Sequence, residues 1–345
     1  MINRKEIKTL GLLSGGLDSS IAVKLMVKLG YHVTVMNFMS PFCTCTKKSD
    51  GCKSAARQIA MECDVEIKTV FMGVEYLEML RAPKHGYGKG MNPCVDCRIM
   101  MFRQAGLVMK EIGARFIFTG EVLSQRPMSQ MKNRLRQIEK ESGLKDLIVR
   151  PLSAALLEPT APEKEGLIDR AEMLAISGRS RKMQFEVGRE LGLDESKFCT
   201  GGGCLLTDVH FAGKMRDLMG HADHISVKEA RLLRIGRHFR ITDDCKVIVG
   251  RNHQENEKLF RMASQGDMVV RVKDHVGPCV VVKGKVNNGE CARAGQIAAR
   301  YSDAPNDTEV KVEISRHPGN GAETEVESVV WVRAINDTEL ERMRV

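Results

Sequence analysis

The sequence has few aromatic residues and no long apolar segment. Phe, Trp and Tyr together make up 5% of the 345 residues, and Trp occurs once. No run of residues approaches the roughly 18–20 apolar positions that a membrane-spanning helix needs. The opening residues, MINRKEIKTL, lack the apolar core of a secretory signal peptide. We therefore expect a cytoplasmic protein with no membrane partner, in which exposed aromatic rings do not dominate binding.

The sequence also lacks low-complexity tracts and internal repeats. Its hydrophobic share of 43% and charged share of 28% are those of an ordinary globular protein. Disorder, a collagen-like structure and a small disulfide-stapled domain are therefore excluded for the chain as a whole. A length of 345 residues predicts two domains, at roughly 150 residues per domain.

Two features are present in excess, namely positive charge and cysteine. Lys and Arg number 53 against 44 Asp and Glu, which gives a formal net charge of +9. Such a surplus favours a polyanionic partner, although net charge governs association and not fold. The 11 cysteines are unusual because structural disulfides are rare in a reducing compartment. They are expected to be either buried side chains or parts of a chemical site.

The first half of the chain alternates between strand and helix patterns. Residues 8–13 and 33–38 form short apolar strands, and residues 19–29 between them carry apolar side chains at helical spacing. The alternation continues with a helix over 54–63, a strand over 66–71, a helix over 98–112 and a strand over 115–119. This pattern predicts an α/β fold with an open parallel sheet, whose ligands bind at the carboxyl ends of the strands.

In the second part of the chain, strand patterns dominate. The expected strands are 238–242, 246–249, 268–272, 279–282, 309–314 and 328–332. One helix, over 289–301, interrupts them. We place the domain boundary near Ala222–Ile225, which gives an α/β domain over 1–222 and a smaller α+β domain over 223–345.

A glycine- and serine-rich segment, SGGLDSS, follows the first strand and covers Ser14–Ser20. Gly15 and Gly16 allow backbone conformations that bring amide groups close to an anion. The helix that follows adds unpaired N–H groups and the positive end of its dipole. Hydroxyl donors come from Ser14, Ser19 and Ser20, and Asp18 can orient Mg²⁺ or cap the helix. A plain strand-to-helix turn is the alternative interpretation.

The cysteines form two groups with ligand-like spacing. Cys94 and Cys97 form a C-x-x-C motif at a loop-to-helix junction, where the helix N-terminus and Arg98 favour thiolates. The best third partner is Cys204, with Cys199 close by. Spacing alone leaves an iron–sulfur cluster, a zinc site and two buried thiols open. A second group, at Cys43, Cys45 and Cys52, is either a thiol relay, a second metal site or a loop with incidental cysteines. The cysteines expected in the core are Cys63, Cys245, Cys279 and Cys291.

The segment SGGLDSS resembles the signature of the PP-loop ATP pyrophosphatases, whose fold is that of the adenine nucleotide alpha hydrolases. These enzymes cleave ATP between its α and β phosphates and adenylate a substrate oxygen. The resemblance implies ATP and Mg²⁺ as ligands of the segment. The sequence lacks the G-x-x-x-x-G-K-[ST] motif of kinase-type P-loops, which argues against transfer of the γ-phosphate.

A longer series of motifs resembles tRNA 4-thiouridine synthase and, more loosely, the tRNA 2-thiouridylases. The motifs are PCVDCRIMM (93–101), TGEVLSQ (119–125), SQ (129–130), NRLRQI (133–138) and RPL (150–152). Members with a C-x-x-C motif and one distant cysteine carry an iron–sulfur cluster, whereas others pass a persulfide. The resemblance thus implies a 4Fe-4S cluster on Cys94, Cys97 and Cys204. The catalytic residues that it implies are Asp18, Cys97 and Cys204, and the implied ATP-site residues beyond Ser14–Ser20 are Met36, Phe38, Gly120 and Gln125.

The chain differs from this family at both ends, since neither a THUMP region nor a rhodanese domain is expected. Residues 236–332 resemble the NFACT RNA-binding domain in the segments GRHFR, VGRNHQEN and DMVVRVKD. That resemblance implies an RNA grip, while a dimerisation domain, and hence a homodimer, is the alternative. Residues 98–150 also hold eleven Lys or Arg against five Asp or Glu, which suits RNA backbone.

Together these patterns predict an ATP-dependent tRNA sulfurtransferase. Its expected partners are tRNA and a sulfur donor, either a cysteine desulfurase or free sulfide. Two other functions are compatible with parts of the sequence: a PP-loop ligase that forms a C–N bond, and a non-catalytic RNA-binding factor. The cysteines argue against the first, and the intact loop with Asp18 argues against the second.

Overall fold

The computed structural model describes residues 3–44, 51–194, 198, 203–319 and 325–345, with no account of the side chains of 51–54. The chain divides into two compact units, Met1–Thr207 and Asp208–Val345. Within the described residues, no helix combines the length and the apolar character needed to cross a bilayer.

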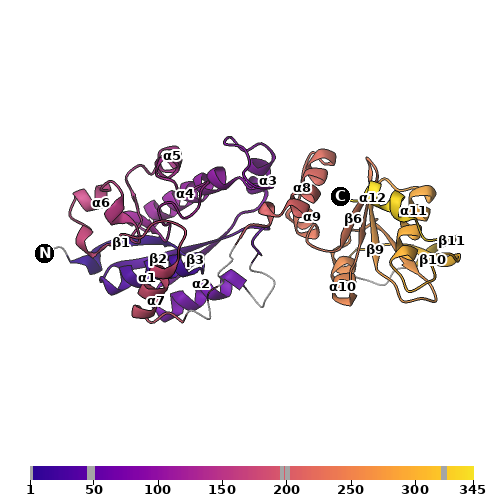
Figure 1. Cartoon of the computed structure of the whole chain (residues 1–345), viewed down its shortest axis with the longest axis horizontal. Coiled ribbons are helices and arrows are strands. Elements are labelled where there is room, and N and C mark those ends of the chain that lie inside the picture. Colours follow the sequence, from indigo (N-terminus) through magenta and orange to yellow (C-terminus); the bar gives the residue numbers. More distant parts are fainter. Residues whose placement is uncertain (1–2, 45–50, 195–197, 199–202, 320–324) are drawn as a thin grey trace. The chain divides into compact units, whose positions relative to one another are not determined.

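The first unit is built on a five-stranded parallel sheet (Figure 1). Its strands are β1 (Lys8–Leu12), β2 (His32–Met39), β3 (Glu66–Phe71), β4 (Phe116–Thr119) and β5 (Ile148–Val149). The strand order is β3-β2-β1-β4-β5, and all neighbouring pairs are parallel. The predicted open parallel sheet is confirmed. Because the order reverses between β1 and β4, a ligand site is expected at the carboxyl ends of these strands.

Helices cover both faces of this sheet (Figure 1). They are α1 (Leu17–Lys28), α2 (Gly51–Glu62), α3 (Val74–Arg81), α4 (Cys94–Glu111), α5 (Lys132–Ser142), α6 (Ala161–Lys164) and α7 (Lys182–Glu190). Short 3-10 turns occur at η1 (Arg4–Glu6), η3 (Ala154–Leu156), η4 (Arg170–Glu172) and η6 (Leu205–Thr207). One apolar core packs α1, α2 and α7 against one sheet face, and another packs α4 and α5 against the opposite face.

Four of these helices, α3, α5, α6 and α7, have no counterpart among the predicted elements. Each is short, and α5 buries only Leu135, Ile138 and Glu139. An apolar stripe of so few residues gives a weak helical periodicity, and tertiary packing supplies most of the stability of such a helix. Local pattern alone therefore could not identify them.

The second unit contains a six-stranded antiparallel sheet with helices on both sides. The strands are β6 (Arg237–Thr242), β7 (Cys245–Val249), β8 (Met268–Val272), β9 (Val280–Gly284), β10 (Val310–Arg316) and β11 (Val326–Val332), in the order β11-β10-β8-β9-β7-β6. The helices are α8 (Val209–His221), α9 (Val227–Leu232), α10 (His253–Met262), α11 (Asn288–Arg300) and α12 (Asp337–Met343). The predicted α+β architecture is confirmed.

The expectation of a single helix in this unit is wrong, because α8, α9, α10 and α12 accompany α11. Helix α10 is mostly polar and fully buries only Leu259, so its apolar spacing is faint. Its start does carry a local signal, since the side chain of Asn252 accepts a hydrogen bond from the backbone N–H of Glu255 at 3.0 Å. N-caps of this kind mark a helix start even where the hydrophobic pattern is weak.

The boundary between the units lies before α8, between Thr207 and Asp208, and not near residue 222. Ion pairs give the physical reason. Asp217 of α8 contacts Arg240 of β6 at 2.7 Å and Lys246 of β7 at 2.7 Å. These cations lower the pKa of Asp217 to about 2 against the opposing effect of burial. Such contacts join α8 to the second sheet, and composition along the chain does not reveal them.

Candidate active site at the carboxyl edge of the parallel sheet

A pocket of about 360 Å³ opens at the carboxyl ends of β1, β2 and β4. The loop between β1 and α1 forms one wall, and Met36 and Phe38 of β2 form another. Residues 119–121 after β4, the first turn of α4 and residues 203–204 complete the lining. The pocket therefore occupies the place that the strand order predicts for a ligand.

The loop between β1 and α1 presents backbone amides to this pocket. Gly15 has a φ of 78°, a conformation that glycine adopts without the steric cost that other residues incur. Gly16 caps α1 with no side-chain hydrogen bond, so the first N–H groups of this helix lack a side-chain acceptor. A helix N-terminus in this state is a site for an anion such as phosphate.

Serine hydroxyls fix the shape of the loop. The backbone N–H of Ser14 donates to Ser19 Oγ at 3.2 Å, and Ser19 Oγ donates to the carbonyl of Gly16 at 2.9 Å. Ser20 Oγ donates to the same carbonyl at 3.0 Å and does not line the pocket. Of the predicted serines, Ser14 and Ser19 thus face the pocket, whereas Ser20 is buried behind it.

Asp18 holds a carboxylate in the pocket wall. Gln125 Nε2 donates to Asp18 Oδ2 at 2.9 Å, while Asp18 Oδ1 is buried without a hydrogen-bond partner among the described residues. Burial raises the pKa of Asp18, and Gln125, Arg181 and Arg126 oppose that shift. An unpartnered carboxylate oxygen beside a phosphate-binding loop fits a Mg²⁺ ligand, because Mg²⁺ in such sites is held by one or two carboxylates and by the phosphates. Gln125 does not line the pocket and acts on it through Asp18.

Gly120 lies at the closest approach between β4 and the loop. A Cβ at this position would lie 2.4 Å from both the carbonyl carbon of Asp18 and the backbone nitrogen of Ser19. Both neighbours are backbone atoms, so no side-chain rotation could relieve the contact. Only glycine therefore lets the end of β4 pack against the start of α1.

The cysteines predicted as ligands converge on the same pocket. Helix α4 begins at Cys94, and Cys97 lies one turn further along. An antiparallel backbone bridge joins Cys204 to Cys43 and so places Cys204 at the same pocket. In that bridge the N–H of Leu205 donates to the carbonyl of Phe42 at 2.8 Å. The cysteines that line the pocket are Cys43, Cys94, Cys97 and Cys204.

Burial raises the pKa of Cys94, Cys97 and Cys204, whereas the sequence favoured thiolates at Cys94 and Cys97. Burial raises the pKa of Cys97 to about 11, although Arg98 and a hydrogen bond with Tyr76 act in the opposite direction. Burial also raises the pKa of Cys204 to about 12. The cost of desolvating a thiolate thus exceeds the stabilisation by the helix N-terminus and Arg98. A ligand that carries positive charge would reverse this balance.

The sequence left an iron–sulfur cluster, a zinc site and two buried thiols open for these cysteines. In the part of the chain that the structure describes, no three His, Cys, Asp or Glu side chains are placed to hold one metal ion. Cys94, Cys97 and Cys204 are partly buried thiols that line one pocket, and thiols are the ligands that an iron–sulfur cluster uses. Cys45, Cys199 and the side chain of Cys52 lie outside the described residues.

Tyr76 of α3 and three arginines are pocket residues that the motif analysis did not single out as site residues. Tyr76 is 2% exposed and hydrogen-bonds with Cys97. Arg98, Arg126 and Arg181 line the pocket, and Arg126 and Arg181 are close enough to Asp18 to lower its pKa. Burial and the neighbouring Arg98 lower the pKa of Arg126. No local pattern marks Tyr76, since it belongs to a helix that periodicity did not reveal.

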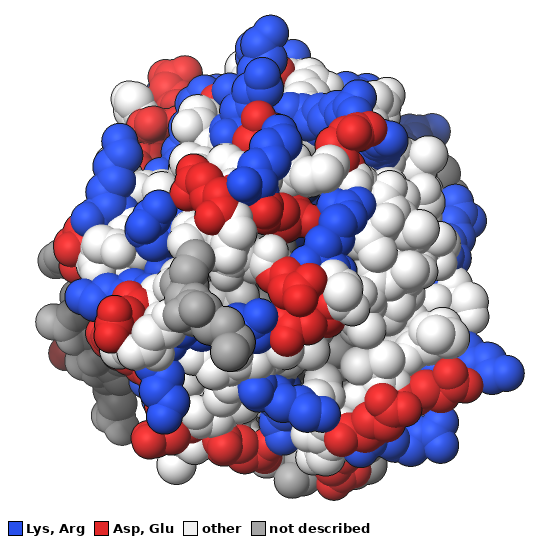
Figure 2. Space-filling model, turned by 90° about the vertical axis from the view of Figure 1, so that its left-hand side faces the viewer, with Lys and Arg blue, Asp and Glu red and all other residues white. Residues whose placement is uncertain are grey.

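The basic residues of the segment 126–136 are divided between the pocket and the surface. Arg126 lines the pocket, together with Ser129 and Gln130. Lys132 and Arg136 instead pair with Glu158, each at 3.2 Å. On the face drawn in Figure 2, Lys and Arg are interspersed with Asp and Glu. Of these basic residues, Arg126 is therefore the one placed to meet an anion in the pocket.

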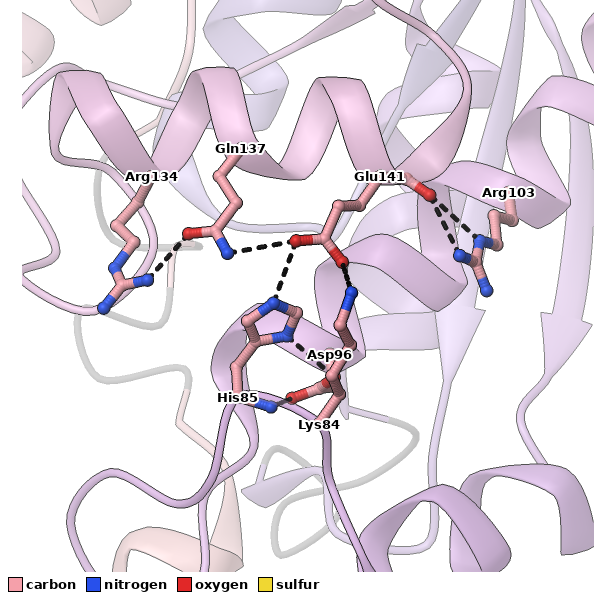
Figure 3. A network of polar contacts seen from close by, with 7 residues as sticks. All are labelled: Lys84, His85, Asp96, Arg103, Arg134, Gln137 and Glu141. Carbon is pink, nitrogen blue, oxygen red and sulfur yellow. Dashed lines mark hydrogen bonds and ion pairs between the residues drawn. The ribbon is translucent and has the colours of Figure 1, made fainter.

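A polar network holds the C-x-x-C turn in place (Figure 3). Asp96, between the two cysteines, accepts a hydrogen bond from the backbone N–H of His85 at 3.0 Å and contacts its Nδ1 at 3.0 Å. His85 Nε2 lies 2.9 Å from Glu141 of α5. Lys84 at 2.7 Å, together with Gln137 and His85, lowers the pKa of Glu141 to about 2. The first turn of α4 is thereby anchored to α5.

Comparisons with known proteins agree with this division into units. Residues 5–174 match the family model described as "Thiamine biosynthesis protein (ThiI)", and residues 236–342 match that described as "NFACT protein RNA binding domain". A crystal structure titled as a 4-thiouridine synthetase–RNA complex with bound ATP is similar, with a TM-score of 0.39 and 21% identity over 62% of this chain and 50% of that one.

Curated relatives carry the name "Probable tRNA sulfurtransferase". The one from Methanosarcina acetivorans is 35% identical over 120 residues, which are 33% of this chain and 27% of the relative. The one from Methanothermobacter thermautotrophicus is 28% identical over 240 residues, or 68% of this chain and 54% of the relative. The chain thus spans between about a quarter and about half of their lengths. Its first unit is thus similar to the ThiI family over residues 5–174, and its second unit is similar to the NFACT RNA-binding domain over residues 236–342.

Proposed function

We propose that this protein is an ATP-dependent tRNA sulfurtransferase that replaces a uridine carbonyl oxygen by sulfur, with 4-thiouridine as the favoured product. The observation that carries the proposal is one pocket that combines the glycine- and serine-rich loop with four cysteines. A loop alone would serve any adenylating enzyme, whereas thiols beside it suit an activated oxygen that sulfur displaces. The family matches and the names of the curated relatives support the same activity.

In the first step the pocket activates the uridine. The phosphates of ATP bind the amides of Ser14–Gly16 and the start of α1, and Met36 and Phe38 lie beside the adenine. The uridine oxygen attacks the α-phosphorus, the bond from that phosphorus to the bridging oxygen breaks, and pyrophosphate leaves. Arg126 and its neighbouring arginines stabilise the charge that develops on the departing pyrophosphate. Asp18 Oδ1 would bind Mg²⁺, which supplies further positive charge at the phosphates.

In the second step sulfur replaces the activated oxygen. A sulfide sulfur attacks the ring carbon, a C–S bond forms, the C–O bond breaks, and AMP leaves with the former carbonyl oxygen. Cys94, Cys97 and Cys204 would hold a 4Fe-4S cluster, which supplies a binding site for that sulfur. The sulfur comes from free sulfide or a cysteine desulfurase. The buried wall that Tyr76 completes keeps water away from the adenylated uridine, which water would otherwise hydrolyse.

The function is tested with protein purified without oxygen. Incubation with an unmodified tRNA transcript, ATP, Mg²⁺ and sulfide is expected to yield 4-thiouridine, together with equal amounts of AMP and pyrophosphate. Mass spectrometry of the digested nucleosides detects the product. About four irons per chain and visible absorbance would support the cluster. Thionucleoside formed from sulfide by iron-free protein would show that sulfide displaces the activated oxygen without a cluster, whereas the absence of any thionucleoside would overturn the proposal.

Replacing Gly120 by alanine is expected to slow ATP-dependent pyrophosphate release by roughly a hundredfold. The added Cβ displaces the backbone of Asp18 and Ser19, and a shift of about 1 Å at a reacting site costs that much. Gly213→Ala is the matched control, because a Cβ there meets no atom within 4 Å. A Gly120→Ala protein that releases pyrophosphate at the wild-type rate would refute this account of the loop.

A further inference from the structure

The sheet of the second unit has an uncovered surface on one side. Helix α11 packs against one face of this sheet. The apolar core on that face takes residues from all six strands. On the opposite face, α9 and α10 cover β7, β8 and β9 through an apolar cluster that includes Leu259 and Val269. That cluster contains no residue of β10 or β11. We call the uncovered side of β10 and β11 the open face.

The single tryptophan of the chain lies on the open face. Val310, Val312 and Val332 point into the core on the α11 side, so the alternating positions of β10 and β11 point outward. Trp331 is 65% exposed and Val329 is 41% exposed. A large indole on an edge strand contributes little to the core in this position.

Positive side chains surround this tryptophan. Lys311 of β10 is paired directly with Trp331 in the sheet register, and Lys273 follows beside it, since its N–H donates to the carbonyl of Lys311 at 2.8 Å. Arg333, 68% exposed, lies two residues beyond Trp331. Arg271 of β8 pairs with Glu313 of β10, which in turn pairs with Val329 of β11 in the sheet register.

The charges on the open face do not cancel. Lys273 pairs with Glu313 at 2.8 Å, and Arg333 lies 3.6 Å from Glu309. Lys311 and Arg271 have no carboxylate within ion-pair distance among the residues that the structure describes. Arg271 instead places its guanidinium over the ring of Phe260, 5.0 Å from the centroid. This contact leaves a flat cation beside a flat aromatic ring.

We propose that the open face binds an unpaired segment of the tRNA substrate, with one base stacked on Trp331 and the phosphates on Lys311 and Arg271. The proposal rests on the proposed function for the identity of the RNA. Single-stranded RNA is recognised by aromatic rings and guanidinium planes on which its unstacked bases lie. Cations beside those rings bind the backbone. An apolar protein partner fits less well. Only two exposed apolar side chains, Trp331 and Val329, lie in these register rows, and cations flank them.

The test uses Trp331 itself as the reporter, since no other tryptophan contributes fluorescence. The full chain is titrated with an unmodified tRNA transcript and with an oligouridine of about ten nucleotides, which is within the usual range of such sites. Both RNAs are expected to quench the fluorescence. Trp331→Ala is expected to weaken RNA binding about tenfold, measured by filter retention, and Trp331→Phe is expected to restore most of the affinity.

Two further variants separate stacking from charge. Lys311→Ala is expected to lower the slope of log Kd against log salt by about one, with less effect on quenching. Met61→Ala, which removes an exposed apolar side chain in the first unit (82% exposed), is the control and should bind RNA as the wild type does.

The outcomes distinguish this surface from the proposed function. Unchanged RNA affinity in Trp331→Ala, or unquenched fluorescence at saturating RNA, would overturn the open face as an RNA site. A change in sedimentation of Trp331→Ala without a change in affinity would also overturn it, in favour of contact between two copies. If the chain forms thionucleoside but fails these binding tests, the proposed function is supported and the open face is rejected as an RNA site. Quenching by RNA without any thionucleoside formation would support the open face as an RNA site and contradict the proposed function.

Discussion

Replacing Cys97 by alanine is expected to reduce thionucleoside formation by about a thousandfold or more, because one of the groups that hold the sulfur site is lost. Cys97 lies in the first turn of α4, beside Tyr76 and in the same pocket as Cys94 and Cys204. Alanine fills nearly the same volume, so we expect a loss of only about 1 kcal/mol in the free energy of unfolding. The protein should therefore fold and still bind ATP.

The two half-reactions make this prediction specific. Pyrophosphate release depends on the loop at Ser14–Ser20 and should persist in Cys97→Ala, whereas mass spectrometry should detect almost no thionucleoside. Cys63→Ala is the matched control, since Cys63 is a half-buried thiol of the same unit that does not line the pocket. If Cys97→Ala retained more than about a tenth of the product, the assignment of this cysteine to the sulfur site would be wrong.

Replacing Arg150 by alanine is expected to lower the free energy of unfolding by about 3–5 kcal/mol. Arg150, 4% exposed, contacts Glu121 at 3.1 Å and also pairs closely with Glu139. Glu121 is itself 2% exposed. Without the guanidinium, Glu121 would keep Arg98 at 3.6 Å, and Glu139 would have no ion-pair partner among the described residues. A buried charge without a partner costs several kcal/mol. Glu121 also lines the pocket, so this pair supports the pocket wall.

Chemical denaturation followed by far-ultraviolet circular dichroism measures this loss. Tryptophan fluorescence would not, because Trp331 belongs to the second unit. Arg115→Ala provides the comparison, since Arg115 pairs with Glu165 at 3.0 Å on the surface, where the side chains are 57% and 53% exposed. Exposed pairs contribute less than about 1 kcal/mol. Equal losses in the two variants would show that burial of the Arg150 pair has no energetic consequence.

Much of the fold could be predicted from the sequence because its signals are local. The strand, glycine turn and helix around Ser14–Ser20 are adjacent in the chain, so apolar spacing and turn residues reveal them together. The strand over 268–272 matches β8 in both bounds, and the strand over 66–71 matches β3. The C-x-x-C motif was placed at a helix start, and α4 begins at Cys94. Helices with few apolar residues, such as α10, could not be predicted, because the residues that they pack against lie far away in the chain.

The sequence by itself determined which chemical groups are available: a phosphate-binding loop, a pair of cysteines one helical turn apart and a candidate third cysteine. Only the tertiary structure decided their environment. The bridge at Cys43 brings Cys204 to the pocket, and burial there raises the pKa of Cys97 to about 11, although its position at a helix N-terminus favoured a thiolate. The same holds for Trp331, whose exposure follows from which strand lies at the sheet edge. Burial and long-range pairing depend on the whole fold, whereas residue type and spacing can be read directly from the sequence.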